Sequence, residues 1–402
     1  MNAKPGRKRA PRDERLDLFR GLAMLIIFIA HVPSNSWNAW IPARFGFSSG
    51  AELFVFCSGF ASALAFGSVF VRRGWLLGAA RILYRVWQIY WAQIGLIFAL
   101  AALAAGLDMA LDRSDFARQF GPLLAEPAHA LFGLATLSWQ PDYLDILPMY
   151  LIILTLVPVV MALRRLHPAL PFAFVVLLYA LAREAGLNLP GNPWTGTGWF
   201  FNPFAWQAIF FIGFFFAMIW LPAPPLRDRW LVIPAAVFVI LSVPLSFWGI
   251  LDHWPGGQAL HDLLLDPGTE KTNLHPLRIA HFLATAYLAL SLIEPWRSRI
   301  GTGAGHLLTA IGRQSLACFL ASLVFARLAA TLTDIAGHDS WVVALSNLAG
   351  FAGILATAHL VAWFKGAPWS RPTVCPAPVP VPATAAHVST QPAVASRLRE
   401  AS

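Results

Sequence analysis

The first long apolar run of the sequence, LDLFRGLAMLIIFIAHV, carries a permanent cation and a titratable base, Arg20 and His31. If the run is a helix, this spacing leaves the two side chains within about 20° of one another around the axis and about 16 Å apart along it. A guanidinium at the inner end of this face could bind the phosphates of a donor, and an imidazole further along could take a proton from a hydroxyl group. The alternative is that Arg20 extends to the membrane surface and His31 caps the helix end.

The second apolar run, SSGAELFVFCSGFASALAF, contains one acid, Glu52. A carboxylate in lipid is costly unless it meets a cation or lies in a polar cavity, so we expect Glu52 to face the interior of a helix bundle. The best candidate partners are His31 and Arg44. Beside His31, the carboxylate could orient the imidazole and stabilise the imidazolium, as the acid of a catalytic triad does. A structural ion pair is the alternative.

Two arginines, Arg81 and Arg85, follow one another at helical spacing in the segment RRGWLLGAARILYRVWQIYW. Side chains four residues apart lie on one helix face, so the pair could clamp a diphosphate. The alternative is that these cations only mark the cytoplasmic end of a span.

Three loops on the opposite side of the membrane combine aromatic side chains with amides and charges. Aromatic faces with such partners can bind a sugar, although tryptophans also gather at membrane interfaces for no catalytic reason. The candidate acceptor-binding residues are Asp142, Asp145, Asn202, Trp206, Gln207, Lys271, Arg278 and His281.

The elements that must position these residues are membrane helices. Hydrophobic residues make up 57% of the 402-residue chain and charged residues 12%, whereas globular chains carry roughly 25% charged residues. Backbone groups in lipid must be satisfied within their own segment, so apolar runs of about 20 residues are helices. We therefore predict an all-α, polytopic membrane protein with about ten spans. They are expected near residues 16–37, 50–71, 84–106, 143–163, 169–182, 204–221, 230–250, 277–293, 315–332 and 341–364, with an interfacial helix near 128–139.

Basic residues set the expected orientation, because Lys and Arg are retained on the cytoplasmic side. Most of the 29 basic residues fall in alternate connections, which places both termini in the cytoplasm and explains the net charge of +9 without nucleic acid. We expect a basic N-terminal segment over 1–15, a transmembrane domain over 16–364, and a disordered Pro/Ala-rich cytoplasmic tail over 365–402. The three cysteines are far apart, and no metal site is predicted. The absence of Walker, HExxH and GxSxG motifs argues against an ATP-driven pump and a lipase-like hydrolase.

Six segments taken in order resemble the OpgC family, the membrane succinyltransferases that modify osmoregulated periplasmic glucans, and more distantly the acyltransferase-3 superfamily. The segments that carry the resemblance are RDERLDLFRGLAMLIIFIAH, AELFVFCSGF, LDILPMY, FNPFAWQAIFFIGF, KTNLHPLRIAHFLATAYL and IGRQSLACF. The Arg and His pair on the first helix of that superfamily corresponds to Arg20 and His31, and its basic motif near the third helix corresponds more loosely to Arg81 and Arg85.

The resemblance implies a multi-pass enzyme of the bacterial inner membrane. It would move an acyl group from cytoplasmic acyl-CoA, either succinyl-CoA or acetyl-CoA, to a sugar hydroxyl of a periplasmic glycan, with no permanently bound cofactor. On this hypothesis Arg20, Arg81 and Arg85 hold the CoA phosphates, and His31, held by Glu52, is the general base. Both direct transfer and an acyl-His31 intermediate are compatible with it.

Two other classes of function remain open at this point. A secondary transporter would use His31, Glu52, Arg278 and His281 as a proton relay, and would move its substrate without consuming a CoA thioester. A non-catalytic membrane scaffold would tolerate the loss of Arg20 and His31 together.

Overall fold

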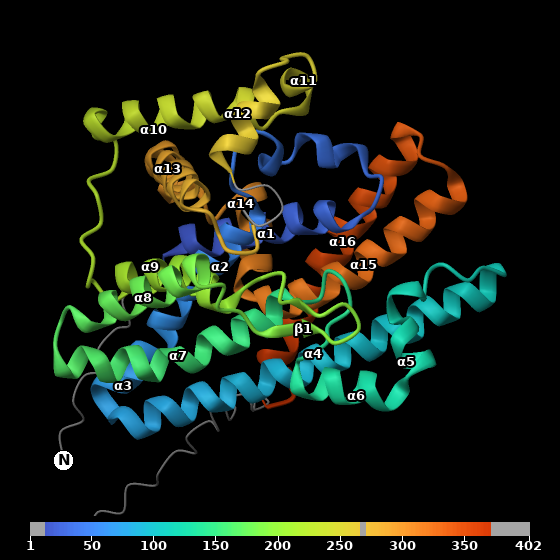
Figure 1. Cartoon of the computed structure of the whole chain (residues 1–402), viewed down its shortest axis with the longest axis horizontal. Coiled ribbons are helices and arrows are strands. Elements are labelled where there is room, and N and C mark those ends of the chain that lie inside the picture. The colour runs from blue at the N-terminus through green and yellow to red at the C-terminus, as the bar shows by residue number, and fades with distance from the viewer. Residues whose placement is uncertain (1–12, 266–270, 371–402) are drawn as a thin grey trace, which may run out of the picture. The chain divides into compact units, whose positions relative to one another are not determined.

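A computed structural model describes residues 13–265 and 271–370, and these residues are predominantly helical (Figure 1). The α-helices are α1 (Glu14–His31), α2 (Gly50–Ser62), α3 (Ser68–Arg73), α4 (Trp75–Leu111), α5 (Gly121–Ala125), α6 (Pro127–Thr136), α7 (Ile146–Leu166), α8 (Leu170–Glu184), α9 (Pro203–Ala217), α10 (Arg229–Ser242), α11 (Trp248–Leu251), α12 (Gly257–Leu264), α13 (Pro276–Ile293), α14 (Gly303–Arg313), α15 (Ser315–Ala336) and α16 (Ser340–Lys365). The strands β1 (Pro190–Asn192) and β2 (Thr197–Gly198) form one small antiparallel hairpin. The predicted all-α class is confirmed.

Six helical segments are long and apolar enough to cross a membrane: Gly50–Arg73, Trp75–Leu111, Ile146–Leu166, Pro276–Arg299, Ser315–Ala336 and Ser340–Ser370. Pro203–Ala217 and Arg229–Leu245 are apolar but shorter. Several apolar helices therefore fit a multi-pass membrane protein, while the total of ten spans and the orientation of the termini stay predictions. The third expected span begins earlier than residue 84, because α4 already starts at Trp75.

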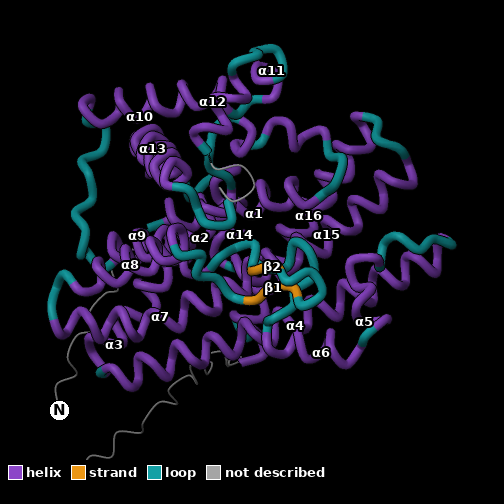
Figure 2. The backbone as a smooth tube through the Cα atoms, in the orientation of Figure 1, coloured by secondary structure: helices purple, strands orange, loops and turns teal. Residues whose placement is uncertain are grey.

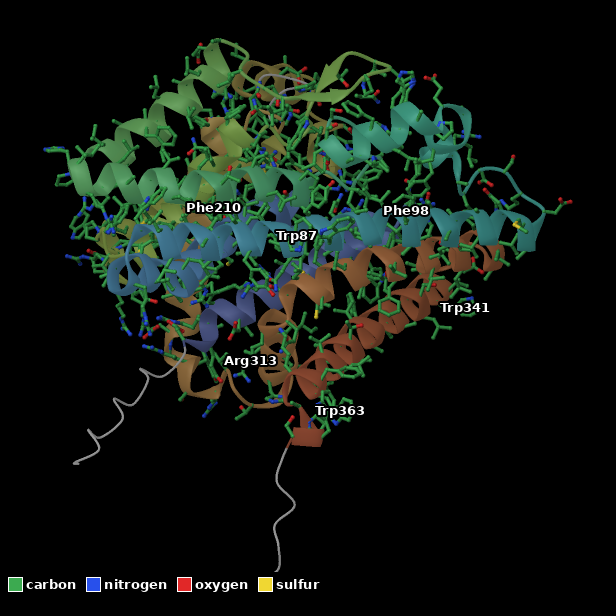
Figure 3. All side chains as sticks on the ribbon, turned by 90° about the horizontal axis from the view of Figure 1, so that it is seen from below. Trp87, Phe98, Phe210, Arg313, Trp341 and Trp363 are labelled. Atoms are coloured by element: carbon green, nitrogen blue, oxygen red, sulfur yellow. The ribbon has the colours of Figure 1, made fainter. Side chains whose placement is uncertain are left out.

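Burial follows the pattern expected of a protein that lies in lipid. Large apolar side chains are exposed on the helices, among them Trp87 and Phe98 of α4, which Figure 3 labels. Glu52, Arg278 and Asn347 are buried instead. Because lipid solvates apolar groups and cannot hydrogen-bond polar ones, this arrangement supports a membrane location.

Helix α1 is held by its close approach to α14. A Cβ atom added at Gly21 of α1 would lie 2.0 Å from the carbonyl oxygen of Leu308, and one added at Gly312 of α14 would lie 1.8 Å from that of Asp17. Only glycine fits at either position, as is common where membrane helices pack backbone to backbone. Helices α2 and α15 also pack on α1, so three neighbours fix the helix that carries Arg20 and His31.

In Figure 1, α4 and α7 run along one side of the bundle, and α10 and α12 lie on the opposite side. Figure 2 shows the β1–β2 hairpin among loops near the middle of the view. Two short 3₁₀ helices, Ser36–Trp40 and Pro42–Arg44, follow α1. These 3₁₀ helices and the hairpin lie near the C-terminal end of α1, together with the start of α2 and Phe319 of α15.

The described residues divide into two compact units between residues 362 and 363. The described part of the second unit contains the end of α16 and the 3₁₀ helix Pro368–Ser370, where the ring centroids of Trp363 and Trp369 are 6.0 Å apart. Most of the N-terminal segment predicted over 1–15, and the predicted tail beyond residue 370, lie outside the described residues.

Candidate active site

A cavity of about 660 Å³ lies at the C-terminal end of α1. Its walls come from α1, the 3₁₀ segment, the start of α2, the loop before α7 and the β1–β2 hairpin. The charged and amide side chains in the lining are His31, Asn38, Arg44, Gln140, Asp142, Asp145, Asn192 and Lys271. The volume and the mixture of aromatic and polar walls suit a small organic ligand with several hydroxyl groups.

His31 is the last residue of α1, because Val32 has an extended backbone and ends the helix. The imidazole Nδ1 lies 2.7 Å from the carbonyl oxygen of Ile27. A carbonyl oxygen can only accept, so we assign the hydrogen to Nδ1, which donates to Ile27 and leaves the lone pair on Nε2. The ring also contacts Tyr143 edge to face, with centroids 5.8 Å apart. This fixed imidazole lines the cavity with a nitrogen that can accept a proton.

Glu52 is fully buried, and the structure gives it a different partner from the one expected. Its Oε1 accepts from Nε and Nη2 of Arg278 at 2.8 and 2.6 Å, and its Oε2 accepts from the backbone N–H and the hydroxyl of Ser49 at 2.8 and 2.7 Å. Both oxygens are occupied, so the predicted contact that would hold His31 is not formed. A permanent cation with several fixed donors neutralises a buried carboxylate better than an imidazole that must first be protonated. The carbonyl of Ile27, rather than Glu52, orients His31.

Three of the predicted acceptor-binding residues, Asp142, Asp145 and Lys271, line the same cavity as His31. Asp145 lies immediately before the membrane-spanning helix α7, and burial raises its pKa to about 6, with the charge of Lys271 opposing the rise and that of Asp142 adding to it. The ammonium of Lys271 lies 5.5 Å from the ring centroid of Phe201. Acids and a cation therefore share one partly desolvated space.

Asn202, Trp206 and Gln207 do not line the cavity, contrary to expectation. All three are fully buried and donate to backbone or side-chain acceptors within the protein. The indole Nε1 of Trp206 donates to the carbonyl oxygen of Lys271 at 2.9 Å, and the Asn202 side chain caps α9. Asn202 and Trp206 support the loop that carries Lys271, whereas Gln207 donates to the carbonyl oxygens of Val175 and Phe204.

Arg278 and His281 of α13 are also set back from the cavity. Arg278 is paired with Glu52. His281 is buried, its Nδ1 lies 2.8 Å from the hydroxyl of Ser48, and its ring packs against Phe47 and Phe238. Both side chains tie α13 to the region where α2 begins.

The three predicted donor-binding arginines occupy separate positions. Arg20 donates from Nη2 to the hydroxyl of Ser315 on α15, and its Nη1 lies 4.0 Å from Asp17. Arg81 is exposed, with its guanidinium 5.7 Å from the ring centroid of Phe66. Arg85 donates to the side chain of Gln88 at 3.3 Å. None of the three lines the cavity, and the Arg20 guanidinium contacts Ser315 of α15 instead.

Several lining residues were missed by sequence reasoning. Tyr143 stood in the sequence between two predicted site residues and could have been found from that position alone. Asn192 and Thr197 lie on the hairpin, and Phe319 lies on α15. They carry no local signal, because only the tertiary fold brings them to the end of α1.

Comparison with known families identifies the chain. The family model described as OpgC protein matches residues 12–366, which include every residue of the cavity. Comparisons with curated proteins and with solved structures found no match. Because the family match covers far more than half of the sequence, the chain belongs to the OpgC family.

Proposed function

We propose that this chain is a membrane O-acyltransferase that moves an acyl group, most simply succinyl, from cytoplasmic acyl-CoA to a hydroxyl of a periplasmic glucan. Membership of the OpgC family implies an acyltransferase role in glucan modification. The observation that carries the proposal is the orientation of His31, whose Nδ1 is bonded to Ile27 while the ring lines a cavity with both aromatic and polar walls. A base held in one tautomer at the end of a helix is suited to activate a hydroxyl group.

His31 acts as the general base in this mechanism. Nε2 takes the proton of the acceptor hydroxyl as its oxygen attacks the thioester carbonyl carbon, so a new C–O bond forms and the carbonyl becomes an oxyanion. The intermediate then collapses, the C–S bond breaks, and the departing CoA sulfur takes the proton back from Nε2. The imidazolium that forms between these steps lies at the C-terminal end of α1, where the negative end of the helix dipole partly offsets the cost of burying its charge.

Direct attack by the acceptor is the simpler of two routes. In the other route Nε2 itself attacks the thioester, and an acyl-imidazole then passes the group to the sugar. Incubation with labelled acyl-CoA in the absence of glucan distinguishes them, because only the second route leaves label on the protein.

The donor enters from the cytoplasm. Arg20, Arg81 and Arg85 are proposed to bind its phosphates, and the pantetheine arm extends along α1 toward His31. The exposure of Arg81 supports a role in binding a ligand outside the bundle. Arg20 lies within the bundle beside Ser315, which supports a place further along the path.

The acceptor occupies the cavity from the periplasmic side. Asp142, Asp145 and Lys271 are proposed to hydrogen-bond its hydroxyl groups, and the lining of the cavity supports this role. Asn202 and Trp206 take part indirectly, since they hold the loop that carries Lys271, and Gln207 helps to fix α9 by donating to Val175 of α8. This account requires an inner-membrane location with both termini in the cytoplasm.

The test is acyl transfer by purified protein in lipid nanodiscs, with succinyl-CoA and glucan as substrates. We expect His31→Ala to lose at least about 100-fold in kcat, the lower range for loss of a general base. Added imidazole should restore part of the rate, because the alanine leaves room for it beside the cavity. The control is His129→Ala, which removes a histidine whose side chain is 80% exposed on α6 and which should keep wild-type activity. Normal transfer by His31→Ala would refute the base assignment.

A further inference from the structure

Tyr143 adopts a backbone conformation that tyrosine rarely takes. Its φ is +66°, in the left-handed region that glycine and asparagine populate at the least cost. A bulky residue held there is strained, and strain of this kind is concentrated at functional sites. The conformation turns the chain between Asp142 and Asp145, so that all three residues line the cavity.

The ring of Tyr143 contributes little to the packing of the protein. The residue is 71% exposed, although its ring meets the His31 imidazole edge to face at 5.8 Å and 72°. Other described non-glycine residues also have a positive φ, but Tyr143 is the one of them that lines the cavity. A strained and exposed aromatic ring in the wall of this cavity is placed to meet a ligand.

Polar groups line the same cavity as the exposed ring. Asp142 adjoins it in sequence, and Asn38, Asn192 and Thr197 belong to the same cavity lining. A pyranose has an apolar C–H face and a rim of hydroxyl groups, so it needs an aromatic platform and hydrogen-bonding groups beside it. The cavity offers both, next to His31.

We propose that Tyr143 is the positioning residue for the acceptor, and that one hexose unit stacks on its phenol ring. Stacking there holds a hydroxyl group of that hexose against Nε2 of His31, and so selects which hydroxyl is acylated. This inference rests on the proposed acyltransferase function and adds to it the residue that determines the position of acylation. Tyr143 takes no proton and forms no bond to the acyl group.

The first experiment measures steady-state transfer from succinyl-CoA to glucan by the full-length protein in nanodiscs. We expect Tyr143→Leu to raise the acceptor KM by on the order of tenfold, the upper range for one aromatic contact, with the donor KM unchanged. Tyr143→Phe keeps the stacking face and should stay close to wild type. NMR of the product should show acyl groups spread over more hydroxyl positions with Leu than with Phe.

The matched control is Trp40→Leu. Trp40 is also exposed, at 70%, and belongs to the segment after α1, but it does not line the cavity. The Trp40→Leu substitution should leave the donor KM, the acceptor KM and the acylated position unchanged. An equal rise in acceptor KM for Trp40→Leu and Tyr143→Leu would overturn the assignment of the platform to Tyr143.

A second variant separates positioning from folding. Tyr143→Gly removes the strain along with the ring, so we expect a melting temperature equal to or above that of wild type together with the raised acceptor KM. A lower melting temperature, or a fall in kcat with an unchanged acceptor KM, would overturn the proposal. Absence of any transfer by the wild-type protein would instead refute the proposed function, so the two failures are distinguishable.

Discussion

The buried pair of Glu52 and Arg278 gives the sharpest prediction about how the site is built. The two side chains are 0% and 8% exposed, and Arg278 Nη2 lies 2.6 Å from Glu52 Oε1. The pair joins the start of α2 to α13 across 226 positions of sequence. We predict that Glu52 stabilises the fold and takes no part in proton transfer.

The loss of folding free energy in each variant follows from the charged group that the substitution leaves in the protein. Arg278→Met keeps the apolar stem but strands a buried carboxylate, which costs about 3–5 kcal/mol of folding free energy. Glu52→Gln keeps an acceptor oxygen for Ser49 but removes the negative charge that neutralises the buried Arg278 guanidinium, with a similar cost. The double variant leaves no unpaired charge, so it should recover at least about 2 kcal/mol relative to the sum of the two single changes.

The assay is a double-mutant cycle on melting temperature in nanodiscs, with transfer measured on the folded fraction of each variant. The single variants should melt on the order of 10 °C below wild type, and the double variant well above either of them. Folded Glu52→Gln should keep a kcat within a few-fold of wild type, since Ile27 rather than Glu52 orients the base.

Two results would refute this reasoning. Additive losses in the double variant would mean that the contact between Glu52 and Arg278 contributes no coupling energy. If Glu52→Gln keeps a normal melting temperature but loses kcat, Glu52 has the catalytic role that the sequence alone suggested.

Three further predictions concern residues around the cavity and the helices that hold it. Because burial raises the pKa of Asp145 to about 6, folding favours its protonated form, and wild-type stability should fall as pH rises from about 4 through 6. Asp145→Asn should therefore raise the free energy of unfolding at pH 7.5 by at most about 3 kcal/mol, seen as a higher melting temperature, and should leave both unchanged at pH 3.5. Equal effects at both pH values would contradict this. Replacing Arg81 and Arg85 together by glutamine should raise the KM for acyl-CoA without changing the acceptor KM. An unchanged donor KM would mean that the two arginines do not bind the donor and only mark the cytoplasmic side of the helix. Asn347 and Asn35 are doubly hydrogen-bonded, and Asn347→Leu removes the acceptor of the buried Nδ2 of Asn35, while its Oδ1 keeps the bond from the Trp37 N–H. The substitution should cost about 1–3 kcal/mol in unfolding experiments, whereas Ser340→Ala at the exposed start of α16 should cost far less.

Local sequence was enough to predict the all-α class and several of the long apolar helices. The apolar run around His31 predicted α1, and the acids of the QPDYLDIL segment predicted one wall of the cavity. Both depend on residues close together in the chain. A lone carboxylate in lipid costs free energy, and on that ground we predicted that Glu52 would be buried and paired, as it is.

Partners distant in sequence could not be predicted in the same way. The choice of His31 or Arg44 for Glu52 favoured cations near it in the chain, whereas the fold brings Arg278 from α13. The amide and indole groups of Asn202 and Trp206 looked suitable for a sugar, but their donors are used within the protein. Residue type predicts which groups a side chain can bind, and only the tertiary fold determines whether a ligand or the protein provides them.

The most direct test of the central claim is transfer across a sealed membrane. Proteoliposomes would hold glucan inside and succinyl-CoA outside, with the protein oriented so that its termini face outward. Wild type should produce free CoA outside and succinyl-glucan inside in equal amounts, and His31→Ala should produce neither. Glucan that crosses the membrane without loss of thioester would favour a transporter, and acylation by His31→Ala at the wild-type rate would contradict the account.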